Sequence, residues 1–273
     1  RTADVSLPSN ASFVIANSLA VSAKAVTADK QYNLRVTECK LGAIIIGKQI
    51  GVEFVKGENI TYRALAEKFL KTKNALSVEQ LIQFEGFCKE HLHSTPYTQN
   101  EIEGLIGGSA TVILDDRRCD NVFNVNSEFY LQQRGVHVYS EARRVLQFKD
   151  TCANAGTIQE LGRLMNESGA SCAEAFDCSC VELNQITELA IRNGAVGSRL
   201  TGAGWGGSTV SLVDSKDVDT FMQKMYDGFY KNNERARAIS DKKMYLFSSA
   251  PAQGAGIVEV GNFLSIDDIN VND

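Results

Sequence analysis

The sequence has 273 residues, with 28 Lys and Arg against 33 Asp and Glu, and a formal net charge of −5 at pH 7. This mild acidity argues against a basic nucleic-acid binder, and 44% hydrophobic with 22% charged residues is typical of a folded chain rather than a disordered or collagen-like one. No stretch reaches the roughly 18 consecutive apolar residues of a membrane helix. The chain starts at Arg1 with neither an initiator Met nor a signal segment, so we expect further sequence upstream.

The sequence predicts a strand, then a series of helices, then two strands, a helix and a closing strand. A β-branched and aromatic run after Pro8 predicts a buried strand at residues 12–20, and the pattern becomes helical from Tyr32. The segment 106–126 is rich in Gly, Asp, Arg and Asn, and we expect a connector there. Further helices are predicted at 61–72, 77–91, 129–149, 157–168, 180–192 and 217–233, and further strands within 195–213 and at 244–248.

This order of elements indicates an α+β fold with helices packed on one face of an antiparallel sheet. The seven cysteines are odd in number and lack the spacing of a disulfide framework, which favours free thiols in a reducing, cytoplasmic compartment. Cys172, Cys178 and Cys180 lack a second arm of ligands, so we interpret them as small buried thiols and expect no metal site.

The most informative segment is Gly197–Ser208, in which four glycines fall between Gly202 and Gly207. Glycines allow positive φ and remove Cβ atoms, so that successive backbone N–H groups can face one anion such as a phosphate. A tight glycine hairpin between two strands explains the same spacing. The Rossmann and Walker A patterns do not fit, because the loop leads into a strand and no Gly-Lys-Ser/Thr follows.

The string RLTGAGWGG from Arg199 resembles the third motif of the GHMP small-molecule kinases, in their galactokinase branch. Four further strings agree in order, and together they cover most of the chain outside about residues 50–125. They are FVIANSLA from Phe13, YNLRVTEC from Tyr32, HVYSEARRVLQFK from His137 and LMNESGASCAEAFDCSCVEL from Leu164. The residues in these strings are similar to those of the eukaryotic group, which includes plant and fungal members.

The resemblance implies a GHMP kinase C-terminal domain with a ferredoxin-like arrangement of helices on an antiparallel sheet. Residues 1–30 would be a remnant of the N-terminal kinase domain. Residues 31–262 would form the C-terminal domain, with a variable insertion at about 50–125. Residues 263–273 would be an acidic, solvated tail.

The resemblance also implies ATP-dependent phosphorylation of galactose at its anomeric hydroxyl, giving galactose 1-phosphate, with ATP and Mg²⁺ as cofactors. Tyr32 matches the family tyrosine that meets the sugar; without the resemblance it would be an aromatic residue at a helix start. A family stretch that borders the nucleotide matches Ser22, Ala23 and Lys24. The part of the glycine loop near the terminal phosphate matches Gly202, Ala203, Gly204, Gly206 and Gly207.

No catalytic residue is assigned, because the family's catalytic Asp matches a position upstream of residue 1. The family's sugar-recognition and serine-rich phosphate motifs do not occur in the sequence either. His137, Glu141 and Arg144 fall at i, i+4 and i+7, and we interpret them as a solvated or ion-paired helix face rather than an acid–base cluster.

Two other functions fit the resemblance. One is an N-acetylgalactosamine kinase, and the other is a non-catalytic transcriptional inducer that binds galactose and ATP. We expect the present chain to be inactive by itself and monomeric, with a regulatory protein partner under the inducer alternative. The expected partners are a galactose-type sugar and ATP, with no nucleic acid and no membrane.

Overall fold

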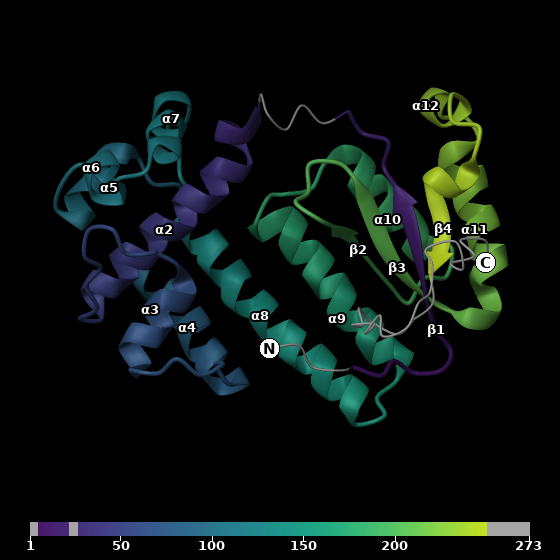
Figure 1. Cartoon of the computed structure of the whole chain (residues 1–273), viewed down its shortest axis with the longest axis horizontal. Coiled ribbons are helices and arrows are strands. Elements are labelled where there is room, and N and C mark those ends of the chain that lie inside the picture. The colour runs from purple at the N-terminus through teal and green to yellow at the C-terminus, as the bar shows by residue number, and fades with distance from the viewer. Residues whose placement is uncertain (1–4, 22–26, 250–273) are drawn as a thin grey trace, which may run out of the picture.

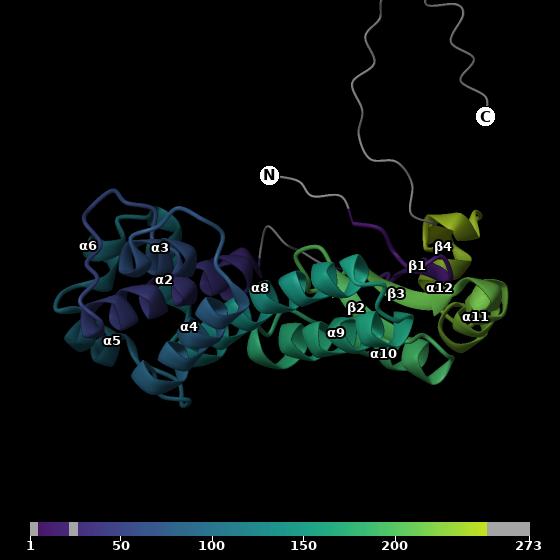
Figure 2. The same cartoon turned by 90° about the horizontal axis from the view of Figure 1, so that it is seen from below.

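The computed structural model describes residues 5–21 and 27–249 of the chain. Figure 1 shows a helical region at one end and a sheet region at the other, and the second view agrees (Figure 2). We define the helical region as residues 27–153 and the sheet region as residues 5–21 and 154–249. The long helix α8 (Leu131–Ala153) belongs to the helical region and runs alongside α9 (Ile158–Ala170) of the sheet region.

The helical region is built around α2 (Tyr32–Gln49), which the periodicity from Tyr32 correctly predicted. Gly42 does not interrupt this helix; a Cβ there would lie 2.1 Å from the Tyr62 hydroxyl, so glycine allows α3 to pack closely. The Ser77–Gln80 capping box starts α4 and is present in full. The remaining helices are α3 (Tyr62–Leu70), α4 (Val78–His91), α5 (Gln99–Ile106), α6 (Ala110–Leu114), α7 (Arg117–Val125) and the short η1 (Ala28–Lys30).

The expectation of a connector at residues 106–126 was wrong, because this segment contains α6 and α7. Asp116 caps α7 by accepting a hydrogen bond from the backbone N–H of Arg118. The helix buries Cys119, Val122 and Phe123 against the core of the helical region. These residues recur at i, i+3 and i+4, the spacing of an amphipathic helix, but the composition of the surrounding residues favoured a connector.

A single core fills the helical region, with aromatic side chains at its centre. Phe84 is fully buried and meets Phe69 and Phe87 edge to face, at ring-centroid distances of 5.7 and 5.3 Å. Tyr139 of α8 lies 5.3 Å from Phe84 and donates a hydrogen bond to the Tyr62 carbonyl. Such pairs add specific geometry to the area they bury.

The sheet region contains four antiparallel strands in the order β2-β3-β1-β4. They are β1 (Ala11–Asn17), β2 (Gly197–Thr201), β3 (Ser208–Asp214) and β4 (Leu246–Ser249). With α10 (Val181–Arg192) before β2 and α11 (Val218–Met225) before β4, the strands follow the βαββαβ order of a ferredoxin-like fold. The predicted α+β class with an antiparallel sheet is confirmed.

Strand β1 lies inside the sheet, where Phe13 pairs with Leu212 on one side and Ser249 on the other. Ala11–Asn17, which fall within the residues 1–30 assigned by the resemblance to a preceding domain, thus pair with strands from the far end of the chain. The proposed domain boundaries stay predictions.

Helices α10 and α11 cover one face of the sheet, where Val14 of β1 packs with Ile186 and Phe221. Successive strand residues point to opposite faces, and Leu212 on the other face packs with Leu161 of α9. Gly162 and Gly197 allow α9 to approach β2 closely, since a Cβ on Gly197 would lie 2.5 Å from the Gly162 carbonyl. The shorter elements are η2 (Ser171–Ala175), η3 (Ser215–Asp217), η4 (Tyr226–Tyr230), α12 (Glu234–Arg237) and η5 (Lys242–Met244).

In the part of the chain that the structure describes, no helix combines the length and the apolar character needed to cross a membrane.

Candidate functional site

The glycine loop, residues Gly202–Gly207, connects β2 to β3 as a hairpin. All four of its glycines have positive φ: 84° at Gly202, 88° at Gly204, 133° at Gly206 and 82° at Gly207. This backbone region strongly favours glycine. The hairpin interpretation is therefore correct for the loop's geometry, and the next question is what the loop faces.

The centre of the glycine loop is fixed to the segment that precedes α10. The Trp205 N–H donates a hydrogen bond to the Cys178 carbonyl at 2.8 Å. A Cβ on Gly204 would lie 1.9 Å from the same carbonyl oxygen, so only glycine fits. Gly204 and Gly206 are buried, whereas Gly202 and Ala203 are exposed. The first residues of the loop, Gly202 and Ala203, are therefore exposed, while its middle is bound to the Cys178 carbonyl.

A cavity of about 620 Å³ lies between α2, α8, η2 and the glycine loop, and we call it the loop cavity. Its wall includes Gly202 and Ala203 together with Tyr32, which is 56% exposed at the start of α2. The structure therefore places Tyr32 and the glycine loop, which are far apart in the sequence, at one cavity. The predicted roles of these residues in binding sugar and nucleotide stay predictions. Ser22, Ala23 and Lys24 lie outside the described residues.

Buried ion pairs stand behind the loop cavity. Glu38 of α2 is fully buried and accepts hydrogen bonds from Arg35 Nη1 and Arg134 Nε, both at 2.8 Å, and from the Tyr130 N–H at 2.7 Å. Arg35 also pairs with Asp177, just before Cys178. Because a buried charge is costly unless paired, this network fixes α2, α8 and the segment at Asp177 relative to one another.

Arg35 lines the loop cavity and is the residue there with spare hydrogen-bonding capacity. Its Nε is buried and has no hydrogen-bond partner among the described residues. The buried Nε–H does not face the cavity, and the contribution of Arg35 to the cavity is the positive charge of its guanidinium. With Arg199 and Lys40 also on the wall, the loop cavity is suited to an anionic ligand.

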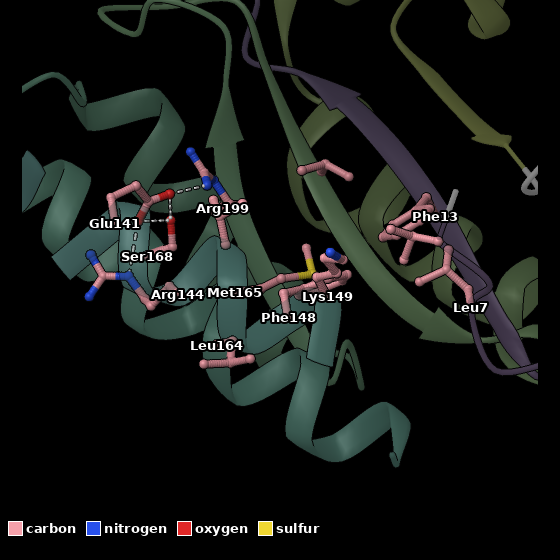
Figure 3. Close-up of a pocket in the computed structure, with 13 residues that line it drawn as sticks. Leu7, Phe13, Glu141, Arg144, Phe148, Lys149, Leu164, Met165, Ser168 and Arg199 are labelled. Carbon is pink, nitrogen blue, oxygen red and sulfur yellow. Dashed lines mark hydrogen bonds and ion pairs between the residues drawn. The ribbon is translucent and has the colours of Figure 1, made fainter. Parts of the chain in front are cut away.

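Glu141 of α8 is held from three directions, as Figure 3 shows. It accepts hydrogen bonds from Ser168 Oγ at 2.6 Å, Arg199 Nη1 at 2.7 Å and Arg144 Nε at 2.9 Å. Burial raises the pKa of Glu141, but the hydrogen bond from Ser168 and the charges of Arg199 and Arg144 lower it by more, so that the pKa lies below its usual value. Glu141 is a fixed anion that positions Arg199 next to the glycine loop, and it is unsuited to proton transfer.

His137 is buried one turn before Glu141, and its ring stacks on Phe176 with a centroid distance of 4.5 Å. Burial lowers the pKa of His137 to about 4. Its Nδ1 forms a hydrogen bond with Ser171 Oγ at 2.8 Å. The prediction of an ion-paired helix face is thus correct for Glu141 and Arg144. The alternative of a solvated face is wrong, because His137 is buried.

A second cavity, also about 620 Å³, opens on the other side of Arg199 and Glu141. Figure 3 shows its apolar wall, with Phe148 of α8 and Met165 of α9 facing Phe13 of β1. Arg199 and Glu141 line both cavities. Their ion pair is therefore a partition between an apolar groove and the loop cavity.

No group of three or more His, Cys, Asp or Glu side chains in the described ranges is arranged to hold a metal ion. Glu141, a carboxylate that lines the loop cavity, is already saturated by Arg144, Arg199 and Ser168. The donor set of the described residues thus does not fit Mg²⁺, and we derive no step through that ion.

Three residues of this site were not predicted from the sequence: Arg35 and Arg199 at the cavity and the buried anion Glu38. Arg35 and Arg199 lie within the strings YNLRVTEC and RLTGAGWGG, which are the signal that identifies them. Glu38 follows Arg35 at i+3, which in sequence is typical of a surface pair. Its burial depends on the packing of α2 against α8.

Comparison with known proteins identifies the sheet region. Residues 148–232 match the family described as GHMP kinases C terminal. This segment is therefore similar to GHMP kinase C-terminal domains. The matched residues include α9, α10, β2, the glycine loop, β3 and α11.

Whole-chain relatives extend this GHMP kinase match. The chain is 35% identical to a galactokinase from Dictyostelium discoideum, over 94% of this chain and 54% of that protein. It is 30% identical to a galactokinase from Saccharomyces cerevisiae, over 91% of this chain and 52% of that protein. The predicted resemblance is confirmed, and the chain spans about half the length of these curated relatives.

A solved structure is similar to this chain in fold. A Lactococcus lactis galactokinase complexed with galactose aligns with a TM-score of 0.51 at 19% identity, covering 88% of this chain and 44% of that one. At this level of identity the likeness concerns the fold alone.

Proposed function

We propose that this chain is the C-terminal part of a galactokinase, which transfers a phosphoryl group from ATP to the anomeric hydroxyl of galactose. The observation that carries the proposal is the loop cavity, which joins Tyr32 to the glycine loop. Support comes from the GHMP kinase match and from the eukaryotic galactokinase relatives.

Phosphoryl transfer depends on positioning and charge stabilisation more than on covalent chemistry by the protein. In the proposal, exposed backbone N–H groups at Gly202 and Ala203 face the transferred phosphate, and ATP supplies that phosphate when bound. Arg35 and Arg199 keep positive charge along the cavity wall, since Glu38 and Glu141 hold them in place. The Tyr32 hydroxyl at the rim would donate to a sugar oxygen.

The described residues supply no base for the sugar hydroxyl. Glu141 is a saturated anion, and His137 is stacked on Phe176. We therefore propose that the base, and the residues that bind Mg²⁺, come from another part of the complete protein. The chain alone is then expected to be inactive.

The compartment and assembly of the protein are also proposals. All seven cysteines are free thiols, which supports a reducing compartment such as the cytoplasm. We propose a monomer.

The test of the function is an assay of the complete polypeptide for ATP-dependent phosphorylation of galactose. Turnover with galactose, and much weaker turnover with N-acetylgalactosamine, is the expected result. Binding of galactose and ATP without turnover would contradict the proposal and indicate an inducer. Turnover by the 273-residue chain alone would contradict its incompleteness.

A matched pair of variants tests the role of Tyr32. Loss of one hydrogen bond in Tyr32→Phe is expected to raise KM for galactose roughly two- to tenfold while leaving KM for ATP unchanged. Tyr226→Phe is the control, because Tyr226 lies far from the cavity beside Lys242 of η5. Equal KM values for the two variants would remove Tyr32 from the sugar site.

A further inference from the structure

Two cysteines meet at the wall of the loop cavity, Cys172 on η2 and Cys178 in the segment before α10. The backbone N–H of Cys178 donates to the Cys172 carbonyl at 3.0 Å, and the Cys178 thiol donates to the same oxygen at 3.4 Å. The chain between them therefore folds back on itself. Both side chains belong to one small cluster with Leu183 and Leu200.

A positive charge lies next to this thiol pair. Arg199 Nη2 donates a hydrogen bond to Cys172 Sγ at 3.7 Å, while Nη1 of the same guanidinium is held by Glu141. The neighbouring Cys178 thiol and the charge of Arg199 lower the pKa of Cys172 despite its burial. Arg199 contacts the sulfur of Cys172 and not that of Cys178. This contact favours Cys172 as the attacking thiol and Cys178 as the resolving thiol.

The other cysteines lack this environment. Burial raises the pKa of Cys39 to about 12, and burial also raises the pKa of Cys152 and Cys180. Cys88 and Cys119 are buried in the core of the helical region. Cys172 and Cys178 line the loop cavity, as Cys39 does, but among the described residues Cys39 has neither a thiol partner nor an arginine contact; each of the pair is at most 5% exposed. A small molecule that enters the cavity can therefore reach them, whereas a macromolecule cannot.

We propose that Cys172 and Cys178 are a site of oxidative modification, at which a small hydroperoxide converts the thiol pair to a disulfide. In the first step the Cys172 thiolate attacks the peroxide oxygen; an S–O bond forms, the O–O bond breaks, and the leaving alkoxide or hydroxide takes a proton. In the second step Cys178 sulfur attacks the resulting sulfenic acid; an S–S bond forms, the S–O bond breaks, and water leaves with the Cys178 proton. The two cysteines lose two electrons and the peroxide gains them.

The disulfide would act on the glycine loop. The Cys178 carbonyl accepts the Trp205 N–H and lies where any Cβ on Gly204 would have to be. Drawing Cys178 sulfur toward Cys172 moves that carbonyl, and the loop that rests on it must follow. This site does not depend on the proposed kinase activity, since its chemistry needs only the described residues and a peroxide.

The experiment is hydrogen peroxide titration of the 273-residue chain, followed by alkylation and peptide mapping. The expected product is a mass loss of two hydrogens and a Cys172–Cys178 disulfide that forms roughly ten times faster than oxidation of Cys152. Cys178→Ser should instead leave a Cys172 sulfenic acid that a dimedone probe traps, and Cys172→Ser should give neither product. Cys152→Ser is the control and should behave as the unaltered chain does.

The outcomes separate clearly. A disulfide that includes Cys180, or Cys172 oxidation no faster than that of Cys152, would overturn the proposal. Because a serine variant can fail to fold, the relative rates are also measured on the unaltered chain, where Cys172 should react with iodoacetamide ahead of the other six thiols. All readouts are masses of the chain itself, so failure here leaves the galactokinase proposal untouched, and the reverse also holds.

Discussion

The helical region and the sheet region obtain their stability in different ways. The helical region has one continuous core, centred on Phe84 and Tyr139. The sheet region divides its buried residues among separate clusters, one under each helix or loop. The loop cavity lies where the two regions meet. The loop cavity therefore has one wall on a single continuous core and the other on a region whose buried residues form separate clusters.

The largest expected effect is in the helical core. Phe84→Ala removes a fully buried ring with three aromatic neighbours, and should lower the free energy of unfolding by about 3–5 kcal/mol. Phe247→Ala in β4 is the control; its ring is 39% exposed, and the loss should be well below half as large. Urea denaturation measures both. Equal losses would show that burial of the Phe84 ring does not stabilise the core of the helical region.

The buried ion pairs at the junction come next. Glu38→Gln leaves Arg35 and Arg134 without their shared anion, and should cost about 3–4 kcal/mol of unfolding free energy. Asp177→Asn is the matched control, because Asp177 is largely exposed and its pair with Arg35 should contribute about 0–1 kcal/mol. A Glu38→Gln variant as stable as Asp177→Asn would show that the network does not hold the regions together.

Acid should loosen the junction through His137. Its pKa is about 4 in the folded chain and about 6.5 when unfolded, so the unfolded state binds the proton more readily. Stability is therefore full above pH 6.5 and falls by about 3 kcal/mol as the pH drops to 4. His137→Gln should flatten this part of the curve of unfolding free energy against pH. An unchanged slope between pH 6.5 and 4.5 would assign the acid sensitivity to other groups.

The smallest expected effect separates two glycines of the loop. Gly204→Ala meets the Cys178 carbonyl at 1.9 Å and positive φ together, and should cost about 2 kcal/mol. Gly202→Ala has the same sign of φ but nothing within 4 Å, and should cost about 1 kcal/mol. Thermal unfolding of both variants gives the difference. If Gly202→Ala cost as much, the loop would be held by its φ angles alone.

Local patterns predicted the helices and strands with a clear periodic signal, such as α9 and β3, and the long apolar helix α2. At α7 the prediction was wrong because composition outweighed periodicity: the segment is rich in Asp, Arg and Asn, although its apolar residues have helical spacing. The motif strings located Tyr32 and the glycine loop, but only folding places them at one cavity. The burial of Glu38 and the thiol pair at Cys172 depend on contacts across the chain, which periodicity does not contain.

Strand β1 carries a consequence for the order of folding. Its partners on β3 lie about 200 residues later in the chain, whereas the helices α2 to α8 contact one another over much shorter separations. Closing so large a loop is entropically costly and slow. On the ribosome the helical region can therefore fold first, while residues 11–17 stay unpaired and exposed until β3 and β4 emerge. During that interval β1 is an apolar segment that a chaperone can bind.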